Sequence, residues 1–222
     1  MHSSFQSMTL VDTIASKMMN NIVQKSYNSN EYDKMYRKRS ITLFEKRALD
    51  LFIDEIRKER PRILDLGCGT GKPYDEYLVQ KECFITGVDF CKKHILMAKK
   101  NVPKATYVCE NFMNYCEDVM YDGIMLLYSL FHVHRTQHKL LLQNIYSRLT
   151  KQGIVLLNIR KNDSGIIKYK SNFCGKPMVW SNYDINTFCD IATDIGFKQI
   201  VLGDEKNFGS KESIVWIILT KS

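Results

Sequence analysis

The stretch that decides the fold is Arg62-Ile-Leu-Asp-Leu-Gly-Cys-Gly-Thr-Gly-Lys72, a short apolar run that ends in alternate glycines. The apolar residues predict a buried strand, and Gly67, Gly69 and Gly71 predict a tight turn directly after it. Because glycine has no side chain, the backbone of such a turn can come close to a ligand. A turn of this kind can also be only a close strand-to-helix connection, so the later segments must decide its role.

The spacing of the glycines separates two classes of ligand. Dinucleotide-binding turns usually carry G-x-G-x-x-G, whereas this turn carries G-x-G-x-G behind an acidic residue, Asp65. Here the chain resembles the class I S-adenosylmethionine (SAM)-dependent methyltransferases, whose first motif has an acidic residue two places before the first of three alternate glycines. The resemblance implies that the turn, Cys68 included, binds SAM, and that Asp65 holds the methionine amino group directly or through water.

A second acidic residue follows the next apolar run. Asp89 ends the strand-like segment Phe84-Ile-Thr-Gly-Val-Asp89 and lies about 20 residues beyond the glycine turn, as ribose recognition requires. Its carboxylate can accept hydrogen bonds from both ribose hydroxyls, and its neighbour Phe90 is a further candidate contact. Alternatively, Asp89 only caps the helix that the sequence predicts from Cys91 to Lys100.

The resemblance also implies an adenine-binding segment after the strand-like residues Ala105 to Cys109. The family usually places there an Asp that reaches the adenine amino group, followed by a residue whose backbone N–H meets a ring nitrogen. This chain has Asn111 and Phe112 at these places, and Asn can still accept through its carbonyl oxygen. A shift of one place would give the first role to Glu110 instead.

The run from Tyr121 to Arg135 predicts a fourth strand that enters a loop with two histidines. It resembles a segment found in many small-molecule methyltransferases, an apolar strand followed by Leu-x-His-(Val/Leu)-Pro-Arg. In this chain His134 replaces the proline. The resemblance implies that Leu127 and Tyr128 line the SAM site. We expect His132 to be the catalytic base or to orient the substrate, because imidazole accepts protons near neutral pH, although it could equally cap the loop. His134 is a candidate substrate contact that we expect to face solvent.

Segments at the N-terminus could cover the site. Apolar residues from Val11 to Val23 recur at helical spacing and predict an amphipathic helix, either a mobile lid or a plain packing helix. We therefore expect residues 1–60 to form a helical cap and residues 61–222 to form the SAM-binding domain. By analogy with related enzymes, Tyr36 and Arg39 are candidates for contacts with the substrate and the SAM carboxylate, although a solvated basic helix face would look the same.

An aromatic and basic insertion after the fifth predicted strand resembles the substrate-capping loop of small-molecule methyltransferases. Arg160 and Lys161 could pair with a carboxylate or a phosphate, and Trp180 could form a wall of the pocket. The alternative is an ordinary surface loop anchored by its aromatic residues.

Apolar runs alternate with helix-compatible stretches along the chain, which predicts right-handed crossovers and a parallel sheet. The last two runs, Phe197 to Leu202 and Ser213 to Leu219, are joined by a loop and predict an antiparallel hairpin. The expected fold is α/β: a Rossmann-like, doubly wound, seven-stranded sheet, mostly parallel, with an antiparallel C-terminal hairpin and helices on both faces.

Composition narrows the function. A chain of 222 residues suits one catalytic domain, and the lack of a long apolar run or secretory leader predicts a soluble, cytoplasmic protein without a membrane partner. The 7 cysteines show no C-x-x-C pair or metal-ligand spacing, which predicts structural thiols and no metal rather than a thiol-assisted metalloid methyltransferase. The net charge of +8 permits an anionic or nucleic-acid partner, although excess lysine can be a solvated surface.

We therefore expect a SAM-dependent methyltransferase, monomeric or homodimeric, that methylates oxygen or nitrogen of a small metabolite and releases S-adenosylhomocysteine (SAH). Whether this metabolite is anionic or neutral is left open by the sequence. An RNA (tRNA) or protein methyltransferase, with the basic segment Lys34 to Arg47 on phosphates, is the second interpretation. A SAM-binding protein without catalysis is the third interpretation. It is disfavoured because the motif residues of the glycine turn and Asp89 are all present.

Overall fold

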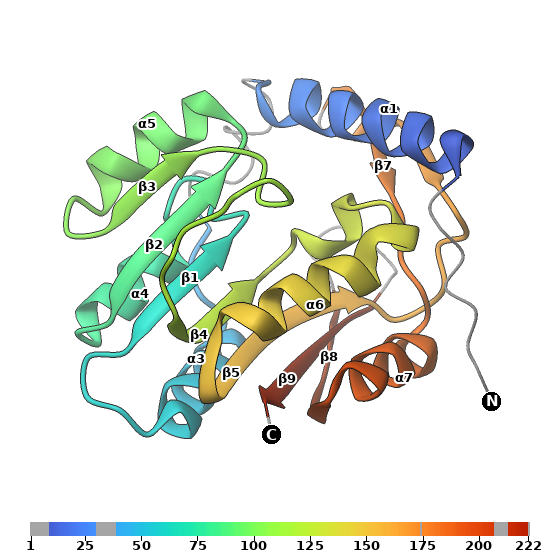
Figure 1. Ribbon diagram of the computed structural model, residues 1–222. Coiled ribbons are helices and arrows are strands. Elements are labelled where there is room, and N and C mark those ends of the chain that lie inside the picture. Colours follow the sequence, from blue (N-terminus) through green and yellow to red (C-terminus); the bar gives the residue numbers. More distant parts are fainter. Residues whose placement is uncertain (1–8, 30–38, 174, 207–212, 222) are drawn as a thin grey trace.

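The computed structural model describes residues 9–29, 39–173, 175–206 and 213–221, and its centre is a seven-stranded sheet with helices on both faces (Figure 1). The strands of this sheet are β1 (Arg62–Leu66), β2 (Phe84–Asp89), β3 (Thr106–Cys109), β4 (Tyr121–Leu126), β5 (Leu149–Arg160), β8 (Phe197–Lys206) and β9 (Ser213–Lys221). Their order is β3-β2-β1-β4-β5-β9-β8, with β9 antiparallel to both of its neighbours and the other pairs parallel. The predicted fold class, including the C-terminal hairpin, is confirmed.

The order of the strands fixes where a ligand can bind. The chain crosses from β1 to β2 on one side and later places β4 on the other side of β1, so the direction of winding reverses between β1 and β4. In open α/β sheets, ligands bind in the crevice at the carboxyl ends of the strands beside this point. The glycine turn follows β1 there, and the histidine-containing loop follows β4.

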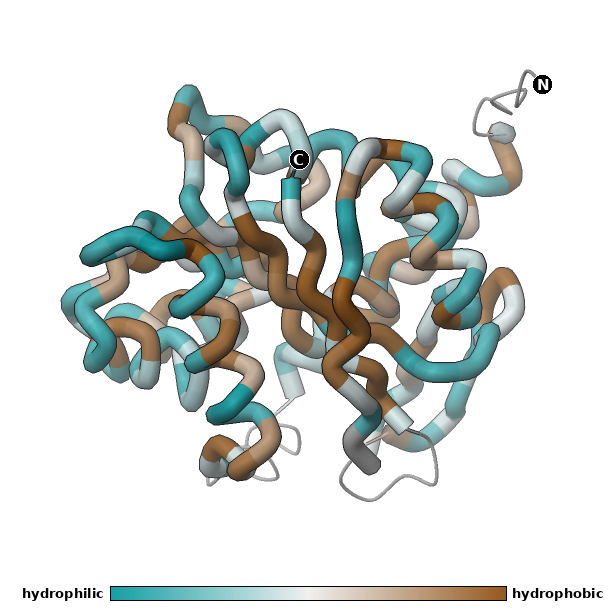
Figure 2. Tube along the Cα trace, turned by 90° about the horizontal axis from the view of Figure 1, so that it is seen from below, coloured by the Kyte–Doolittle hydropathy of each residue, from teal (hydrophilic) through white to brown (hydrophobic). Residues whose placement is uncertain are grey.

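Helices cover both faces of the sheet (Figure 1). They are α1 (Leu10–Tyr27), α3 (Leu43–Ile56), α4 (Tyr74–Gln80), α5 (Lys92–Asn101), α6 (His138–Arg148) and α7 (Ile185–Ile195), with short 3-10 turns η1 (Leu130–His132) and η2 (Arg135–Gln137). Successive residues of β4 enter opposite apolar cores, Ile124 on one face and Met125 on the other, as the two-residue period of a strand requires. Buried on both faces, the central strands are almost continuously apolar (Figure 2).

Helix α1 forms as expected but buries only the C-terminal part of its predicted apolar stripe. It begins with a capping box between Thr9 and Asp12. Met19 and Val23 are buried, whereas Ile14 is 52% exposed. Only part of the apolar stripe is used because α1 lies across the carboxyl end of the sheet, above the loops, instead of on an apolar sheet face (Figure 1).

The segment expected as a capping loop is instead a β-hairpin. Strands β6 (Lys168–Phe173) and β7 (Lys176–Trp180) pair antiparallel as a separate two-stranded sheet. Met178 and Val179 are buried, and β7 packs against α1. The hairpin therefore supports the underside of the N-terminal helix.

Candidate active site

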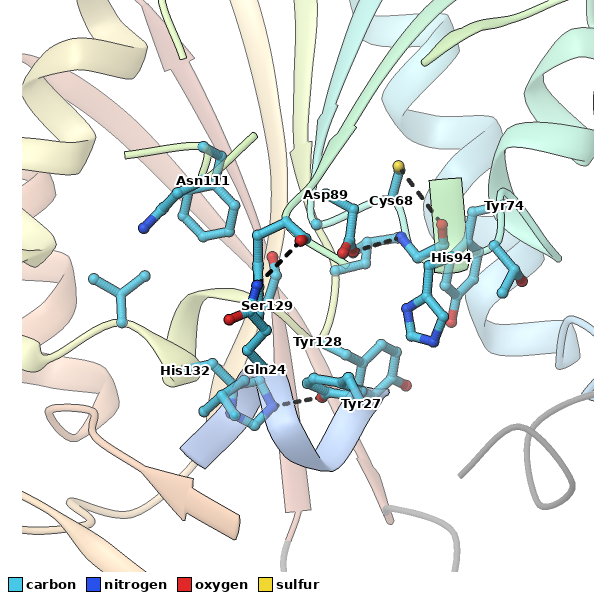
Figure 3. A pocket seen from close by; sticks show the side chains of 18 of the residues that line it. Gln24, Tyr27, Cys68, Tyr74, Asp89, His94, Asn111, Tyr128, Ser129 and His132 are labelled. Atoms are coloured by element: carbon cyan, nitrogen blue, oxygen red, sulfur yellow. Dashed lines mark hydrogen bonds between the residues drawn. The ribbon is translucent and has the colours of Figure 1, made fainter. Parts of the chain in front are cut away.

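A cavity of about 540 Å³ lies at the carboxyl ends of β1, β2 and β4, beneath α1 (Figure 3). Its lining comes from α1, the glycine turn, the residues after β2, β3 and β4, and Arg39 in the segment before α3. Segments far apart in the sequence therefore meet around one space.

The three glycines of the turn have different functions. All three have positive φ angles, 94° at Gly67, 54° at Gly69 and 72° at Gly71, which favour glycine. A Cβ on Gly67 would lie 2.5 Å from the Cβ of Ser129, and one on Gly71 would lie 2.5 Å from the hydroxyl of Tyr107, but one on Gly69 would meet no other atom within 4 Å. Gly67 and Gly69 line the cavity, whereas Gly71 lies outside its lining and is required for packing.

Asp89 joins the glycine turn to the start of α5, and its role in ribose binding stays a prediction. One carboxylate oxygen accepts from the backbone N–H of Gly69 at 3.0 Å, and the other accepts from the N–H of Cys91 at 2.7 Å. Asp89 also lines the cavity, beside Phe90 and Cys68. Because each carboxylate oxygen has a second lone pair, Asp89 can hold the turn in place and still accept from a ligand.

Asp65 lies behind the turn and outside the cavity lining. It is 4% exposed, and burial, followed by the charge of Asp75, raises the pKa of its carboxyl well above the usual value. Burial also raises the pKa of Asp75 to about 7, while the hydroxyl of Tyr107 donates to Asp75 at 2.9 Å. The cavity lining therefore gives no support to a direct contact between Asp65 and a ligand, and a contact through water stays a prediction.

Arg39 lies between two tyrosine rings at the edge of the cavity. Its guanidinium carbon is 5.5 Å from the ring centre of Tyr74 and 4.5 Å from that of Tyr128, and the two rings are nearly parallel. Arg39 also forms an ion pair with the fully buried Glu45, whose oxygen accepts from the Tyr74 hydroxyl at 2.6 Å and from that of Tyr128 at 3.1 Å. Burial alone would lower the pKa of Arg39, but the two tyrosines and Glu45 raise it. The candidate Tyr36 lies outside the described residues.

Hydrogen bonds of Tyr128 and Ser129 hold the loop after β4 at the cavity. Its φ of 57° is unusual for a residue with a side chain, and its N–H donates to the buried amide oxygen of Asn158 at 2.7 Å. The next residue, Ser129, donates from its hydroxyl to the carbonyl of Leu66 at 2.7 Å. The loop after β4, including Leu127, is thereby tied to the end of β1 and lines the cavity.

The segment after β3 supplies Asn111 and Phe112 to the lining. The side-chain oxygen of Asn111 accepts from the N–H of Met113 at 3.0 Å and keeps one further lone pair. Glu110 lies outside the lining and accepts from the N–H of Asn111. Of the two candidates that the sequence left open, the cavity therefore receives Asn111.

His132 lies at the opposite wall from the cofactor motifs (Figure 3). Its Nε2 is 2.7 Å from the hydroxyl of Tyr27, and its Nδ1 is 3.1 Å from the carbonyl oxygen of Val179. Burial and, to a smaller extent, the charge of nearby Arg160 lower the pKa of His132 to about 4. The imidazole is therefore neutral near pH 7.

The remaining candidates lie outside the cavity lining. His134 is 1% exposed rather than facing solvent, because the loop folds back under α1, and its Nδ1 is 2.8 Å from the hydroxyl of Thr136. Arg160 stacks over the ring of Trp180 at 5.0 Å, and Lys161 forms an exposed ion pair with Asp204. None of these four candidates, His134, Arg160, Lys161 and Trp180, is brought to the cavity in this structure.

Sequence reasoning missed several cavity residues, chiefly Tyr27, Tyr74 and Ser129. It also missed Glu45, which supports Arg39 from below. A signal for Glu45 exists, because Thr42-x-x-Glu45 is a capping-box sequence. That pattern predicts the start of a helix, but not that the carboxylate is buried under an arginine.

Comparison with known proteins agrees with this site. Residues 63–153 match the family model described as a methyltransferase domain. This segment is therefore similar to a methyltransferase domain. The matched segment extends from β1 into β5 and includes the glycine turn, Asp89, Asn111 and His132.

Curated relatives match over a shorter stretch. The malonyl-[acyl-carrier protein] O-methyltransferase of Bacillus cereus is 31% identical over 100 residues, which are 44% of this chain and 36% of that protein. The protein of the same name from Bacillus cytotoxicus is 31% identical over 105 residues and is covered to 34%. The match thus spans about a third of the length of these relatives.

Solved structures extend the likeness of fold to nearly the whole chain. The 1,6-didemethyltoxoflavin-N1-methyltransferase of Burkholderia thailandensis superposes with a TM-score of 0.72 at 13% identity, covering 93% of this chain and 90% of that chain. The magnesium protoporphyrin IX methyltransferase of Synechocystis gives 0.69 at 15% identity, covering 92% and 97%. The predicted resemblance to class I SAM-dependent methyltransferases is confirmed.

Within the described ranges, every helix is too short or too polar to cross a bilayer. Among the same residues, no group of three or more His, Cys, Asp or Glu side chains is arranged to hold a metal ion. The metal-free reaction stays a prediction.

Proposed function

We propose that this protein is a SAM-dependent methyltransferase that transfers a methyl group to oxygen or nitrogen of a small molecule. The observation that carries the proposal is that one cavity joins a glycine turn and a buried ribose-type carboxylate, Asp89, to a second wall with a neutral histidine, His132. Such a cavity can hold a nucleoside cofactor and an acceptor at the same time.

The residues of the first wall fit SAM. Asp89 would accept from the ribose hydroxyls, and the open backbone at Gly69 allows close approach of the ligand. Asn111 and Phe112 would contact the adenine, while Arg39 would pair with the methionine carboxylate. When bound, SAM supplies a methyl group on a positively charged sulfur.

The chain's own contribution is alignment and exclusion of water. Tyr128 presents an aromatic ring to the cavity, and an aromatic face attracts a cation such as a sulfonium. Helix α1 covers the cavity and contributes Asn20, Gln24 and Tyr27 to its lining. An acceptor that reacts beneath this helix must be small, or must present a small group.

The relatives support a small acceptor. Two similar folds are named as methyltransferases of 1,6-didemethyltoxoflavin and of magnesium protoporphyrin IX. An RNA acceptor remains the second interpretation, and it rests on the net charge of +8. A cytoplasmic location, a functional boundary near residue 60 and a monomeric or homodimeric state also stay proposals.

Two measurements test the function. Isothermal titration calorimetry should give SAM and SAH dissociation constants, and absence of SAM binding would overturn the proposal. Radiolabelled methyl transfer should then be screened against pools of alcohols, phenols, amines, carboxylic acids and tRNA. Affinity for tRNA that falls steeply between two salt concentrations, together with transfer to tRNA alone, would favour the RNA interpretation.

A further inference from the structure

Two acidic side chains are in contact beneath the glycine turn. Asp75 of α4 is fully buried, and its Oδ2 accepts from the hydroxyl of Tyr107 of β3 at 2.9 Å. Within the described part of the chain, no N–H or O–H donates to its Oδ1. The carboxyl of Asp65 lies in hydrogen-bonding contact with Asp75. Because two carboxylates have no hydrogen to share, this contact requires a hydrogen on one of them.

The surroundings of the two carboxyls place that hydrogen on Asp65. Donation from Tyr107 favours the charged form of Asp75. Burial, followed by the charges of Asp75 and Asp89, disfavours the charged form of Asp65. Asp65 can then donate to the enclosed Oδ1 of Asp75, which gives this oxygen the donor that it otherwise lacks. Asp75 is therefore the member of the pair that ionises first.

The charge of this pair reaches the wall of the cavity. Cys68 belongs to the glycine turn and lines the cavity. Burial, followed by the charges of Asp75, Asp89 and Asp65, raises the pKa of its thiol well above the usual value. A charge that disfavours an anion at this wall favours a cation beside it. The ionised form of Asp75 therefore attracts a cationic ligand in the cavity.

We infer that Asp75 is a proton-linked switch for the cofactor, which releases its proton to solvent when cationic SAM binds and takes a proton back once the sulfonium charge is gone. This inference rests on the proposed function, because SAM must bind in the cavity. Asp65 keeps its hydrogen throughout and donates it to Asp75 in both states. SAH has lost the sulfonium charge, so it gains less from the ionised form. The preference for SAM over SAH should therefore rise with pH.

The pH range of this switch lies around neutrality. Burial raises the pKa of Asp75 to about 7. A cation in the cavity lowers this pKa, so SAM binding releases protons and strengthens as the pH rises toward 7. Well above pH 7, Asp75 is ionised with or without SAM, and the affinity no longer changes from this source.

Other titratable groups pack around the pair. His94 of α5 acts on Asp89 at the end of β2, whose carboxylate is already bonded by two backbone N–H groups. Burial raises the pKa values of the Tyr107 hydroxyl and of the Cys68 thiol, so neither group ionises near pH 7. The amino group of SAM also titrates. Comparison of the wild-type protein with Asp75→Asn cancels these contributions, because both proteins contain them.

Calorimetry of SAM binding measures the released protons. Titrations at pH 7 in phosphate and in Tris, whose ionisation enthalpies differ, give the number of protons released by each protein. With SAM, the wild-type protein should release about 0.3–0.5 proton more than Asp75→Asn, and with SAH this excess should be smaller. Asp54→Asn, which neutralises an exposed carboxylate of α3 outside the cavity lining, should match the wild type. No excess with SAM, or the same excess with SAM and SAH, would overturn the inference.

Infrared spectroscopy tests the wild-type protein directly and does not depend on the folding of Asp75→Asn. At about pH 6, the carbonyl band of protonated carboxylic acids, assigned with ¹³C-labelled aspartate, should lose intensity when SAM binds and lose less with SAH. An unchanged band with SAM bound would refute the switch while leaving the methyltransferase function intact. Failure of the wild-type protein to bind SAM would instead remove the proposed function, so the two failures are distinguishable.

Discussion

The cavity has one wall that we propose holds the cofactor and another that we propose faces the methyl acceptor, and the two walls are built in different ways. The cofactor wall consists of backbone turns at the ends of neighbouring strands, where Gly69, Asp89 and Cys91 are joined by short hydrogen bonds. The acceptor wall joins Tyr27 to His132 across 105 residues and His132 to Val179 across 47. The comparison teaches that the cofactor wall is preformed by the sheet, whereas the acceptor wall depends on how α1 and the hairpin pack.

Glu45→Ala is the strongest way to break the cofactor wall. It leaves the Arg39 guanidinium between two rings without its buried anion, and loss of one partner of a buried pair costs about 3–5 kcal/mol. Urea unfolding should show this loss, and calorimetry should show weaker SAM binding. Glu45→Gln, which keeps the shape and one acceptor oxygen, should lose less. A change below about 1 kcal/mol would mean that the ion pair does not stabilise the fold.

Asp89→Ala should weaken SAM binding by about 1–3 kcal/mol, because it removes both the ligand's acceptor and the partner of two backbone N–H groups. Calorimetry measures the change, and Asp89→Asn, which retains one acceptor oxygen, is the matched control. The imidazole ¹⁵N signals of His132 in two-bond hydrogen–nitrogen spectra should not move, because the acceptor wall is built separately. Unchanged SAM affinity would place ribose recognition elsewhere.

Asp75→Asn tests the acids beneath the glycine turn. A folded pKa of about 7, raised by burial, means that Asp75 contributes stability at low pH that is lost as pH rises toward 7. His132 and His138, with folded pKa values of about 4, act in the opposite direction, because stability falls as pH drops below about 6.5. Relative to wild type, the free energy of unfolding of the variant, measured by urea unfolding, should therefore rise by on the order of 1 kcal/mol per pH unit between pH 5 and pH 7. Parallel pH profiles would show that Asp75 is ionised throughout.

Ser16→Ala should have the smallest effect and should act on the acceptor wall alone. The Ser16 hydroxyl donates to Gln137 at 2.6 Å, and loss of such a bond costs about 1 kcal/mol. Amide hydrogen exchange should quicken within α1 but not in the central strands. Thr13→Ala, which removes a hydroxyl bonded only within the helix, is the control. Equal exchange in both variants would show that this contact does not hold α1.

Motifs along the sequence identified most of the cofactor wall. Positions that match strand ends, such as Gly67, Asp89, Asn111 and Tyr128, all line the cavity. Asp65 and Gly71 belong to the same motif but lie outside the lining. Asp65 instead interacts with Asp75, and Gly71 packs against Tyr107. Spacing predicts the turn; it does not determine which of its residues faces the ligand.

The acceptor wall was only partly predictable. His132 follows a strand end and could be proposed from chemistry, but its partner Tyr27 lies on a helix whose apolar pattern matches the buried face only in part. Trp180 and Arg160 were expected in the pocket and instead stack on each other beside it. No periodicity in the sequence encodes such contacts, since they arise where the hairpin and α1 meet.

The close approach of Gly67 to Ser129 has an evolutionary consequence. A methyl group on Gly67 would lie 2.5 Å from the Ser129 Cβ, and Ser129 is itself bonded to the residue before Gly67. Neither position can accept a larger side chain unless the turn moves away from β4, which would change the cavity. We therefore expect the two positions to vary together during divergence, so that a change at one predicts a compensating change at the other.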